Sequence, residues 1–186
     1  EPSLGCFKPR GVVQLVHGMA EHIERYDDFA RFLASKGFIV GGYDHLAHGE
    51  SVSQSTSWGE LDPRNGANHL IEDVHRMRSY MLAHTPAGLP YFVFGHSMGS
   101  YIMRDYIARH GDGLAGAILC GTGYVAPIVS KAGNMLSRAI AAIRGKGYES
   151  KLLDSMAAGG FNRVIDDPRT EADWISANEE NVDRYL

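Results

Sequence analysis

Short apolar runs alternate with helical patterns along the first two thirds of the chain. Four of these runs have the length of a strand and consist mainly of aliphatic and aromatic residues; they cover 11–16, 38–43, 91–94 and 114–120. Continuous apolar runs are typical of strands buried on both faces, and their alternation with helices indicates parallel strands joined by crossovers. The pattern predicts an α/β fold with a mostly parallel, doubly wound sheet.

Apolar residues at helical spacing predict the connecting helices. These helices cover residues 26–35, 70–82 (after a polar loop at 62–68) and 100–110. After Tyr124 helical patterns continue at 129–143 and 151–158 without another strand. We interpret 1–124 as the N-terminal part of a sheet-containing core and 125–186 as the start of a helical cap over the active edge of the sheet. Additional core helices would produce the same periodicity.

Composition excludes several classes of protein. The 186 residues are 44% hydrophobic and 22% charged, with a net charge of -4, which disfavours nucleic-acid binding because that requires a basic excess. The apolar runs are too short to span a bilayer, and no signal-peptide pattern opens the chain. Cys6 and Cys120 have neither metal nor disulfide spacing. Cys120 is predicted to be a small core residue, and a cytoplasmic setting is favoured.

The motif with the most chemical content is Gly95-His96-Ser97-Met98-Gly99. It follows the third strand directly and opens a helix, which is the context of a nucleophile elbow. At such a turn the serine has strained backbone and lifts its hydroxyl above the sheet, while a side chain on Gly95 or Gly99 would collide with a neighbouring strand or helix. Ser97 is therefore the candidate catalytic nucleophile.

A serine nucleophile also needs hydrogen-bond donors for the oxyanion that forms when it attacks a carbonyl. One donor is expected to be the backbone N–H of Met98, the residue after the nucleophile. The other is expected from the loop after the first strand, where Gly18 lets the backbone turn and the N–H of Met19 is the candidate. Both groups of this predicted oxyanion hole belong to the main chain.

Three segments together resemble one family of enzymes. His-Gly-Met-Ala-Glu-His-Ile-Glu-Arg-Tyr at 17–26, Asp-His-Leu-Ala-His-Gly-Glu-Ser at 44–51 and the elbow at 95–99 are similar to blocks of the monoacylglycerol lipase and lysophospholipase family. These are α/β-hydrolases of the serine aminopeptidase-like group. The order and separation of the blocks match from about Gly11 to Gly123. Two departures are Ala47 and Ser100, at positions where the family usually or often has glycine.

The resemblance implies an α/β-hydrolase fold, incomplete in this chain, and hydrolysis of an ester that joins one fatty acyl chain to glycerol or a glycerophospho group. It implies no cofactor and no metal, with a small lipid ester as partner. An apolar cap surface would permit transient membrane contact, although no polybasic cluster supports it. The same apparatus would also serve a non-lipid esterase, a thioesterase or a peptidase.

The catalytic base is the missing component. In this fold the acid and the histidine follow the serine in chain order, and the last histidine is His110. It lies thirteen residues after Ser97 on one helix, roughly 20 Å away at about 1.5 Å rise per residue. His96 is expected to point away across the turn, and His17 is expected to have a structural role in the oxyanion loop. As the resemblance implies, we expect the acid and the histidine beyond Leu186; a module that binds a ligand without catalysis is the non-enzymatic alternative.

Two further patterns suggest a ligand-binding site, but each also has a purely structural interpretation. Asp44, His45 and His48 resemble metal ligands but lack a third ligand segment, so a loop held by hydrogen bonds is favoured. Residues 121–126 match a degenerate dinucleotide-binding motif, but at the fourth strand and directly before Pro127.

Glu21 and Arg25 are four residues apart and could pair to brace the oxyanion loop, or form an exposed pair worth under about 1 kcal/mol. The apolar stripe of the later helix could line an acyl tunnel or pack the cap; it consists of Met135, Leu136, Ile140 and Ile143.

Overall fold

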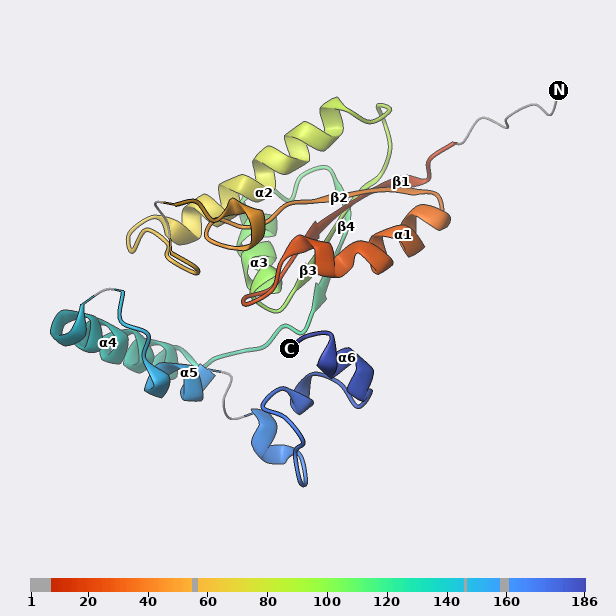
Figure 1. Cartoon of the computed structure of the whole chain (residues 1–186). Coiled ribbons are helices and arrows are strands. Elements are labelled where there is room, and N and C mark those ends of the chain that lie inside the picture. Colours follow the sequence, from red (N-terminus) through yellow and green to blue (C-terminus); the bar gives the residue numbers. More distant parts are fainter. Residues whose placement is uncertain (1–7, 55–56, 146, 158–160) are drawn as a thin grey trace. The chain divides into compact units, whose positions relative to one another are not determined.

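The structure is a computed structural model that describes residues 8–54, 57–145, 147–157 and 161–186. Cys6 and the predicted helix end at Ala158 lie outside these ranges. The chain divides into two compact units, Glu1–Tyr124 and Val125–Leu186. Figure 1 labels the elements of both units.

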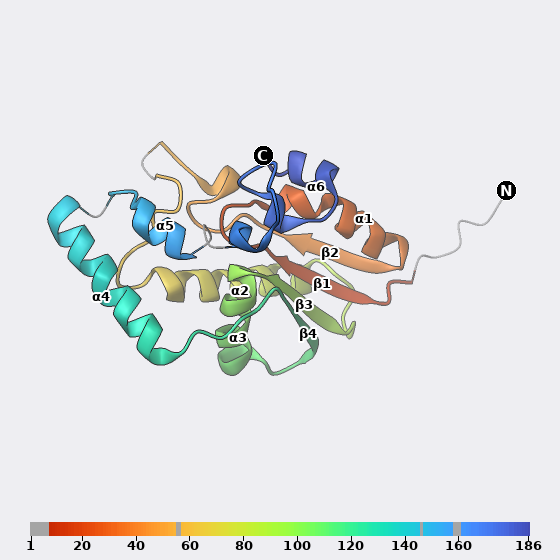
Figure 2. The same cartoon turned by 90° about the horizontal axis from the view of Figure 1, so that it is seen from below.

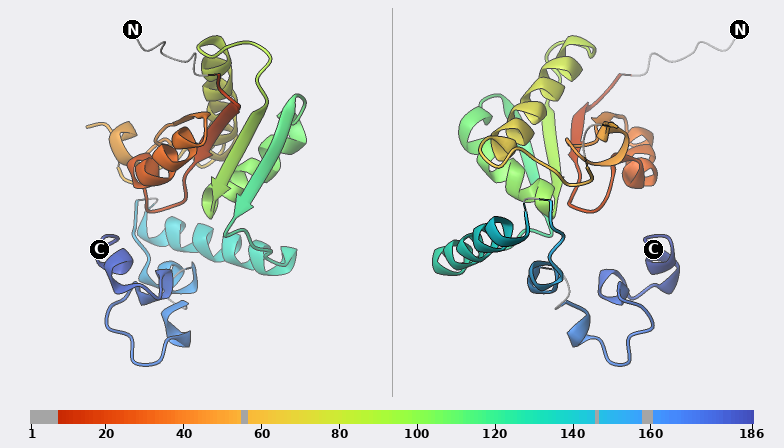
Figure 3. Two further views of the ribbon diagram at one scale, coloured as in Figure 1. Left: turned by 90° about the vertical axis from the view of Figure 1, so that its right-hand side faces the viewer. Right: turned by 60° about the vertical axis from the view of Figure 1, so that its left-hand side comes forward.

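The first unit is built on a four-stranded, fully parallel sheet with the order β2-β1-β3-β4. The strands lie side by side in the left view of Figure 3. Their bounds are Gly11–Val16 for β1, Phe38–Gly42 for β2, Tyr91–His96 for β3 and Leu114–Cys120 for β4. The four predicted strands are thus all present, in an open sheet whose order places β1 and β3 at the centre.

Helices cover both faces of this sheet, as the doubly wound prediction requires. Figure 2 shows α1 on one side of the strands and α2 with α3 on the other, and α1 packs on β2 while α2 packs on α3. The bounds are Asp27–Ser35 for α1, Gly66–Ala83 for α2 and Met98–His110 for α3. Two 3-10 turns, Ile23–Tyr26 and Gly49–Ser51, lie in the loops after β1 and β2. The predicted end of the loop at residue 68 is wrong, because α2 already begins at Gly66.

The core lies between the central strands and the helices α2 and α3. All six residues of β1 are buried, and Val12, Val74 and Met103 are fully enclosed. Gln14 is the polar exception within β1. Its amide donates to the carbonyl of Val74 at 3.1 Å and its oxygen accepts from the Tyr91 hydroxyl at 2.8 Å, so its burial leaves no unpaired polar atom.

The prediction that β4 is buried on both faces is wrong. Ile118 is 53% exposed, and Cys120, predicted as a core residue, is also exposed. The physical reason is position: β4 is at one edge of the sheet, and among the described residues only β3 and α3 make extensive contact with it. An apolar sequence identifies a strand but does not identify which of its sides is covered.

The second unit contains helices and 3-10 turns, with no strand among its described residues. Its elements are α4 (Pro127–Arg144), α5 (Lys151–Ala157), 3-10 turns at Phe161–Val164 and Asp173–Ile175, and α6 (Glu179–Asp183). Phe161 and Trp174 pack with their ring centroids 4.9 Å apart. In the predicted stripe, Met135 and Ile143 are 73% and 81% exposed, while Leu136 and Ile140 are half-buried. Within the described residues, no helix has both the length and the apolar character needed to cross a membrane.

A buried arginine connects the two helices on the same face of the sheet. Arg78 of α2 donates to the carbonyl oxygens of His110 and Asp112, both at 2.8 Å, at the end of α3 and just past it. Its guanidinium also lies 5.5 Å from the ring centroid of Tyr91. The charge is buried, but it is satisfied by the unpaired carbonyl groups at the end of a helix, where a cation is favoured.

We predict that Arg78→Gln lowers the free energy of unfolding by about 2–3 kcal/mol, because carbonyl groups lose a charged donor. The matched control is Arg76→Gln on the same helix, whose side chain is 75% exposed and pairs with Asp73. Its cost should stay below about 1 kcal/mol. Urea unfolding of both variants of the complete protein measures the difference, and equal costs would contradict the assigned role of Arg78.

Candidate active site

Ser97 lies at the turn between β3 and α3, as the sequence predicts. Its backbone has φ 50° and ψ -118°, in the left-handed region that residues other than glycine rarely adopt. A conformation of this kind costs about 1–3 kcal/mol and persists only where the surrounding structure enforces it. Its side chain is half-buried.

Two glycines make the turn sterically feasible. A Cβ on Gly99 would lie 2.2 Å from the carbonyl oxygen of Val16, at the end of β1. A Cβ on Gly95 would lie 2.6 Å from the carbonyl oxygen of Gly99 and 2.6 Å from Cγ of Met103. The predicted collisions are therefore confirmed: α3 begins in direct backbone contact with the central strand.

Hydrogen bonds hold the turn from two sides. The Ser97 N–H donates to the carbonyl of Cys120 at 2.9 Å, which ties the turn to the end of β4. The Ser97 carbonyl accepts from the Ser100 N–H at 2.9 Å and from the Ser100 hydroxyl at 2.6 Å. Ser100 is fully buried. Sequence reasoning treated it only as a departure from the family pattern; its spacing of three residues from Ser97, at a helix start, is the signal for this contact.

The loop after β1 lies against Ser97. A Cβ on Gly18 would be 3.1 Å from Cβ of Ser97, and Ala20 has the left-handed φ of 57°. Among hydrogen bonds between described residues, neither Met19 nor Met98 donates its backbone N–H. The first amides of a helix have no intrahelical partner, which leaves Met98 N–H available in α3. The action of the Met19 and Met98 N–H groups as an oxyanion hole remains a prediction.

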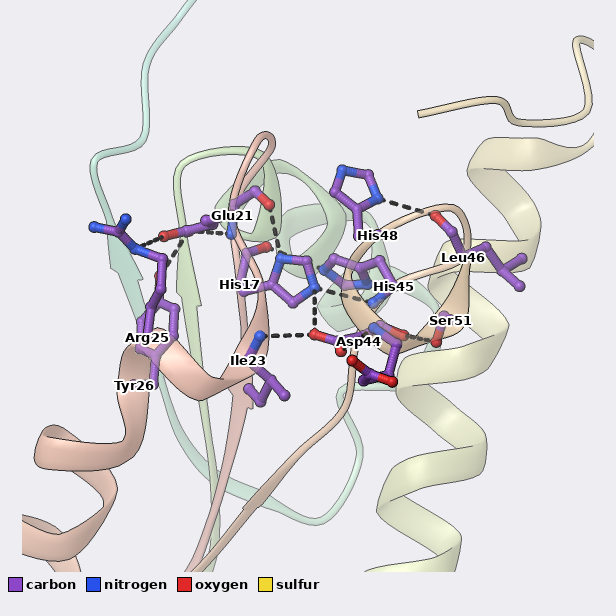
Figure 4. A network of polar contacts seen from close by, with 12 residues as sticks. His17, Glu21, Ile23, Arg25, Tyr26, Asp44, His45, Leu46, His48 and Ser51 are labelled. Atoms are coloured by element: carbon purple, nitrogen blue, oxygen red, sulfur yellow. Dashed lines mark hydrogen bonds and ion pairs between the residues drawn. The ribbon is translucent and has the colours of Figure 1, made fainter. Parts of the chain in front are cut away.

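Glu21 is the centre of the polar contacts in this loop. Its Oε1 accepts hydrogen bonds from the backbone N–H of Gly18, from the Tyr26 hydroxyl at 2.8 Å and from Nδ1 of His96 at 3.0 Å. Its Oε2 lies 3.7 Å from Nε of Arg25, and Figure 4 shows Arg25 and Tyr26 beside it. The predicted pairing of Glu21 with Arg25 is confirmed, but the stronger contacts are those to the loop, to Tyr26 and to His96.

These contacts change two pKa values. Burial opposes ionisation of Glu21, yet the hydrogen bonds from His96, Tyr26 and Gly18 outweigh it and lower the pKa of its carboxyl. The hydrogen bond to Glu21 raises the pKa of the His96 imidazole above its usual value, against the opposing effect of burial. The carboxylate and the protonated imidazole therefore stabilise each other.

Behind the loop, three histidines form a buried cluster, which Figure 4 shows beside Asp44. The rings of His17 and His45 lie 4.1 Å apart, and those of His17 and His48 lie 5.5 Å apart. His17 Nδ1 donates to the Gly18 carbonyl at 2.7 Å, while its Nε2 accepts from the His45 backbone N–H at 3.0 Å. This pattern assigns the neutral form to His17. Its Nε2 therefore carries no proton for an ion pair with the Asp44 carboxylate at 3.8 Å.

Asp44 organises the loop after β2. One carboxylate oxygen accepts from the Ile23 N–H at 2.7 Å and the other from the Glu50 N–H at 2.8 Å. In the part of the chain that the structure describes, no group of three His, Cys, Asp or Glu side chains could hold a metal ion. Ala47 has φ 60°, which explains why glycine would fit this position without strain.

The histidines considered as bases occupy other positions. Both ring nitrogens of His17 are engaged and the side chain is fully buried, so it cannot accept the Ser97 proton. His96 directs Nδ1 to Glu21. His110 stacks on His75 at 4.3 Å and pairs with Glu72 at the far end of α3. The described ranges therefore place each of these three histidines in contacts other than the Ser97 hydroxyl.

The glycine-containing segment after β4 contributes to the elbow. A Cβ on Gly121 would lie 3.4 Å from the His96 ring and 3.6 Å from the Ser97 nitrogen. The Gly123 carbonyl accepts from Arg104 of α3 at 2.9 Å. These contacts give the segment a structural role beside Ser97 that does not require a dinucleotide.

A strained serine between a parallel strand and a helix, on a sheet with helices on both faces, defines the α/β-hydrolase fold. Residues 7–186 match the serine aminopeptidase S33 family, so the chain belongs to that family. The match covers most of the chain and confirms the resemblance inferred from the three sequence blocks.

Relatives and solved structures agree with this assignment. A thermostable carboxyl esterase from Bacillus coagulans, solved in complex with glycerol, is 39% identical with a TM-score of 0.83, over 96% of this chain and 56% of that one. The monoacylglycerol lipase of Mycolicibacterium smegmatis is 31% identical over 95% of this chain and 55% of its own length. Human monoglyceride lipase is 30% identical over 60% of this chain and 34% of its own. The chain thus spans about half the length, or less, of these relatives.

The strain at Ser97 yields a prediction about stability. Ser97→Gly should be more stable than Ser97→Ala by about 1 kcal/mol, because glycine relieves a strain of about 1–3 kcal/mol but gains more freedom when unfolded. Ala108→Gly, at an exposed position of α3, should instead destabilise the protein by about 1 kcal/mol. Urea unfolding of the complete protein measures all three variants. A lower free energy of unfolding for Ser97→Gly than for Ser97→Ala would contradict the strained conformation of the turn.

The histidine cluster predicts acid sensitivity. Burial lowers the pKa of His17, and burial with the neighbouring His17 lowers the pKa of His45 to about 3. The unfolded chain therefore binds more protons below pH 6.5, and stability falls as the pH decreases from there. Each histidine contributes a slope of about 1.4 kcal/mol per pH unit while only its unfolded form is protonated.

The window from about pH 6 to about 5 separates these two groups from Glu21, which with its lowered pKa acts below it, and from His96, which with its raised pKa acts above it. His45→Gln keeps a donor for the His17 carbonyl. It should lower the slope of stability against pH by the contribution of about one proton. Chemical unfolding at several pH values measures this slope. An identical slope in the wild type and in His45→Gln would contradict the assignment.

Proposed function

We propose that the protein is a serine hydrolase that cleaves carboxylic esters of monoacyl lipids, a monoacylglycerol or a lysophospholipid, through an acyl-enzyme on Ser97. The observation that carries the proposal is the backbone of Ser97 at φ 50° between Gly95 and Gly99. Such strain is typical of functional sites, and here it presents one hydroxyl at the end of the sheet.

In the proposed reaction, the Ser97 hydroxyl loses its proton to a base and its oxygen attacks the ester carbonyl. The negative charge that forms on the carbonyl oxygen is stabilised by the N–H groups of Met19 and Met98. The tetrahedral intermediate releases the alcohol, which takes the proton, and leaves an acyl group on Ser97. Water then gives a proton to the base and attacks the acyl carbonyl, and the Ser97 oxygen takes up that proton as the fatty acid is released. Removal of one such donor typically costs about 3–4 kcal/mol of transition-state stabilisation.

The proposal requires a base and an acid that follow Ser97 in chain order, as in other α/β-hydrolases. The described part of the chain supplies no histidine in contact with Ser97, and the chain spans about half the length of the relatives that carry the proposal. A polypeptide limited to residues 1–186 would retain only the small rate that an oxyanion hole and binding provide. Tests of activity therefore require the protein expressed from its complete natural coding sequence.

The lipid substrate is supported by the named relatives, since two of them are a monoacylglycerol lipase and a monoglyceride lipase. The exposed apolar residues of α4, including Met135 and Ile143, fit a cap that covers an acyl chain. The family description, a serine aminopeptidase, favours a peptidase as the second candidate. A series of nitrophenyl esters of increasing acyl length, tested against aminoacyl amides, separates the two, because a lipid enzyme prefers chains of several carbons.

We predict that Ser97→Ala in the complete protein abolishes ester hydrolysis and labelling by a fluorophosphonate. The expected loss of kcat is at least about 10⁴-fold, as for removal of other serine nucleophiles. Hydrolysis of nitrophenyl butyrate and gel-based labelling measure the two effects. The control is Ser137→Ala on α4, whose hydroxyl donates to the carbonyl of Asn134 in its own helix. Unchanged turnover in Ser97→Ala would exclude the proposed nucleophile.

A further inference from the structure

We propose that Glu21 is a positioning residue that holds the two halves of the oxyanion hole at a fixed spacing, acting through the Gly18 amide on one side and through His96 on the other. This inference rests on the proposed function and adds to it a residue other than the nucleophile and the two proposed oxyanion donors. It gives the Glu21 carboxylate an effect on catalysis, which membership in the family does not by itself specify.

The evidence is the convergence of three donors on one oxygen. Oε1 of Glu21 accepts from the Gly18 N–H, from the Tyr26 hydroxyl at 2.8 Å and from His96 Nδ1 at 3.0 Å. Gly18 and Tyr26 belong to the two ends of the loop between β1 and α1, and His96 is the last residue of β3. One atom thereby closes the loop after β1 on itself and connects it to the end of β3.

The loop after β1 and the end of β3 each lie beside a proposed oxyanion donor. Gly18 directly precedes Met19, so the hydrogen bond to Glu21 fixes the peptide plane next to the one from which the Met19 N–H projects. His96 directly precedes Ser97 and is two residues before Met98. A shift of one segment against the other would change the distance between the two donors, and a misplacement of about 1 Å can reduce a rate about 10²-fold.

The environment keeps the carboxylate charged and its contacts short. The Glu21 side chain is 10% exposed, so its hydrogen bonds compete little with water. The charged or titratable groups that face it are Tyr26, Arg25, His96 and, more distantly, His17. A Cβ on Gly18 would lie 2.6 Å from Oε1, so the loop approaches the carboxylate as closely as the absence of a side chain allows.

The first test compares Glu21→Leu with Glu21→Gln in the complete protein, with nitrophenyl butyrate as substrate. Leu removes the acceptor, and kcat should fall about 10- to 100-fold while KM changes less than about twofold, because the loss lies in the transition state. Gln keeps an acceptor oxygen without the charge and should recover most of kcat. The matched control is Glu72→Leu, which removes a similar contact, 3.3 Å, to His110 at the other end of α3.

The second test changes His96, the partner of Glu21, and its two single variants do not depend on the folding of the Glu21 variants. His96→Asn keeps an N–H near the position of Nδ1 and should retain kcat, whereas His96→Leu should lose it as Glu21→Leu does. In the double variant Glu21→Leu/His96→Leu, the losses should not add, because both remove the same connection.

The outcomes separate the two proposals. A wild type without Ser97-dependent hydrolysis overturns the proposed function, and the role of Glu21 falls with it. An active wild type in which Glu21→Leu and His96→Leu keep kcat within about twofold of the control overturns the positioning role alone. The positioning role is equally overturned if KM rises as much as kcat falls, or if Glu72→Leu matches the loss.

Discussion

The close contact between the start of α3 and the end of β1 is the constraint on which the site depends. A Cβ on Gly99 would lie 2.2 Å from the Val16 carbonyl oxygen, so the helix can begin at this point only without a side chain there. The chain must then turn sharply within one residue, which places Ser97 at φ 50°. Hydrogen bonds from Ser97 to Cys120 and from Ser100 to Ser97 hold the strained residue in place. The strain is therefore maintained by the sheet as well as by the local sequence.

Two carboxylates with little solvent exposure organise the loops at this end of the sheet. Asp44 accepts backbone N–H groups from Ile23 and Glu50, and so joins the loops after β1 and β2. Glu21 joins the loop after β1 to the last residue of β3 through Gly18 and His96. Backbone N–H groups in the loops at the carboxyl ends of parallel strands have few backbone carbonyl acceptors, so charged carboxylates accept their hydrogen bonds instead. The neutral side chains of His17 and His45 fill the space behind, where a charge would be poorly solvated.

The sequence predicted the fold well where the pattern reflects local geometry. All four strands, their parallel direction and the helices on both faces follow from apolar runs that alternate with helical spacing. The prediction failed for β4, because hydrophobicity indicates a strand but not which of its faces a neighbour covers. Cys120 is exposed for the same reason. The early start of α2 at Gly66 was missed because glycine and asparagine are poor indicators of a helix.

For the candidate site, the sequence by itself determined the Gly-x-Ser-x-Gly motif and the family, and it predicted that the loop after β1 lies beside Ser97, because each of these rests on a short block of consecutive residues. Only the tertiary structure decided what the polar side chains do. Glu21 and His96 are separated by 75 positions, and His17 and His45 by 28, so no local pattern could pair them. Their hydrogen bonds form because parallel strands end at the same edge of the sheet and bring distant loops together. Chain spacing specifies the sharp turn, whereas packing specifies the polar network that supports it.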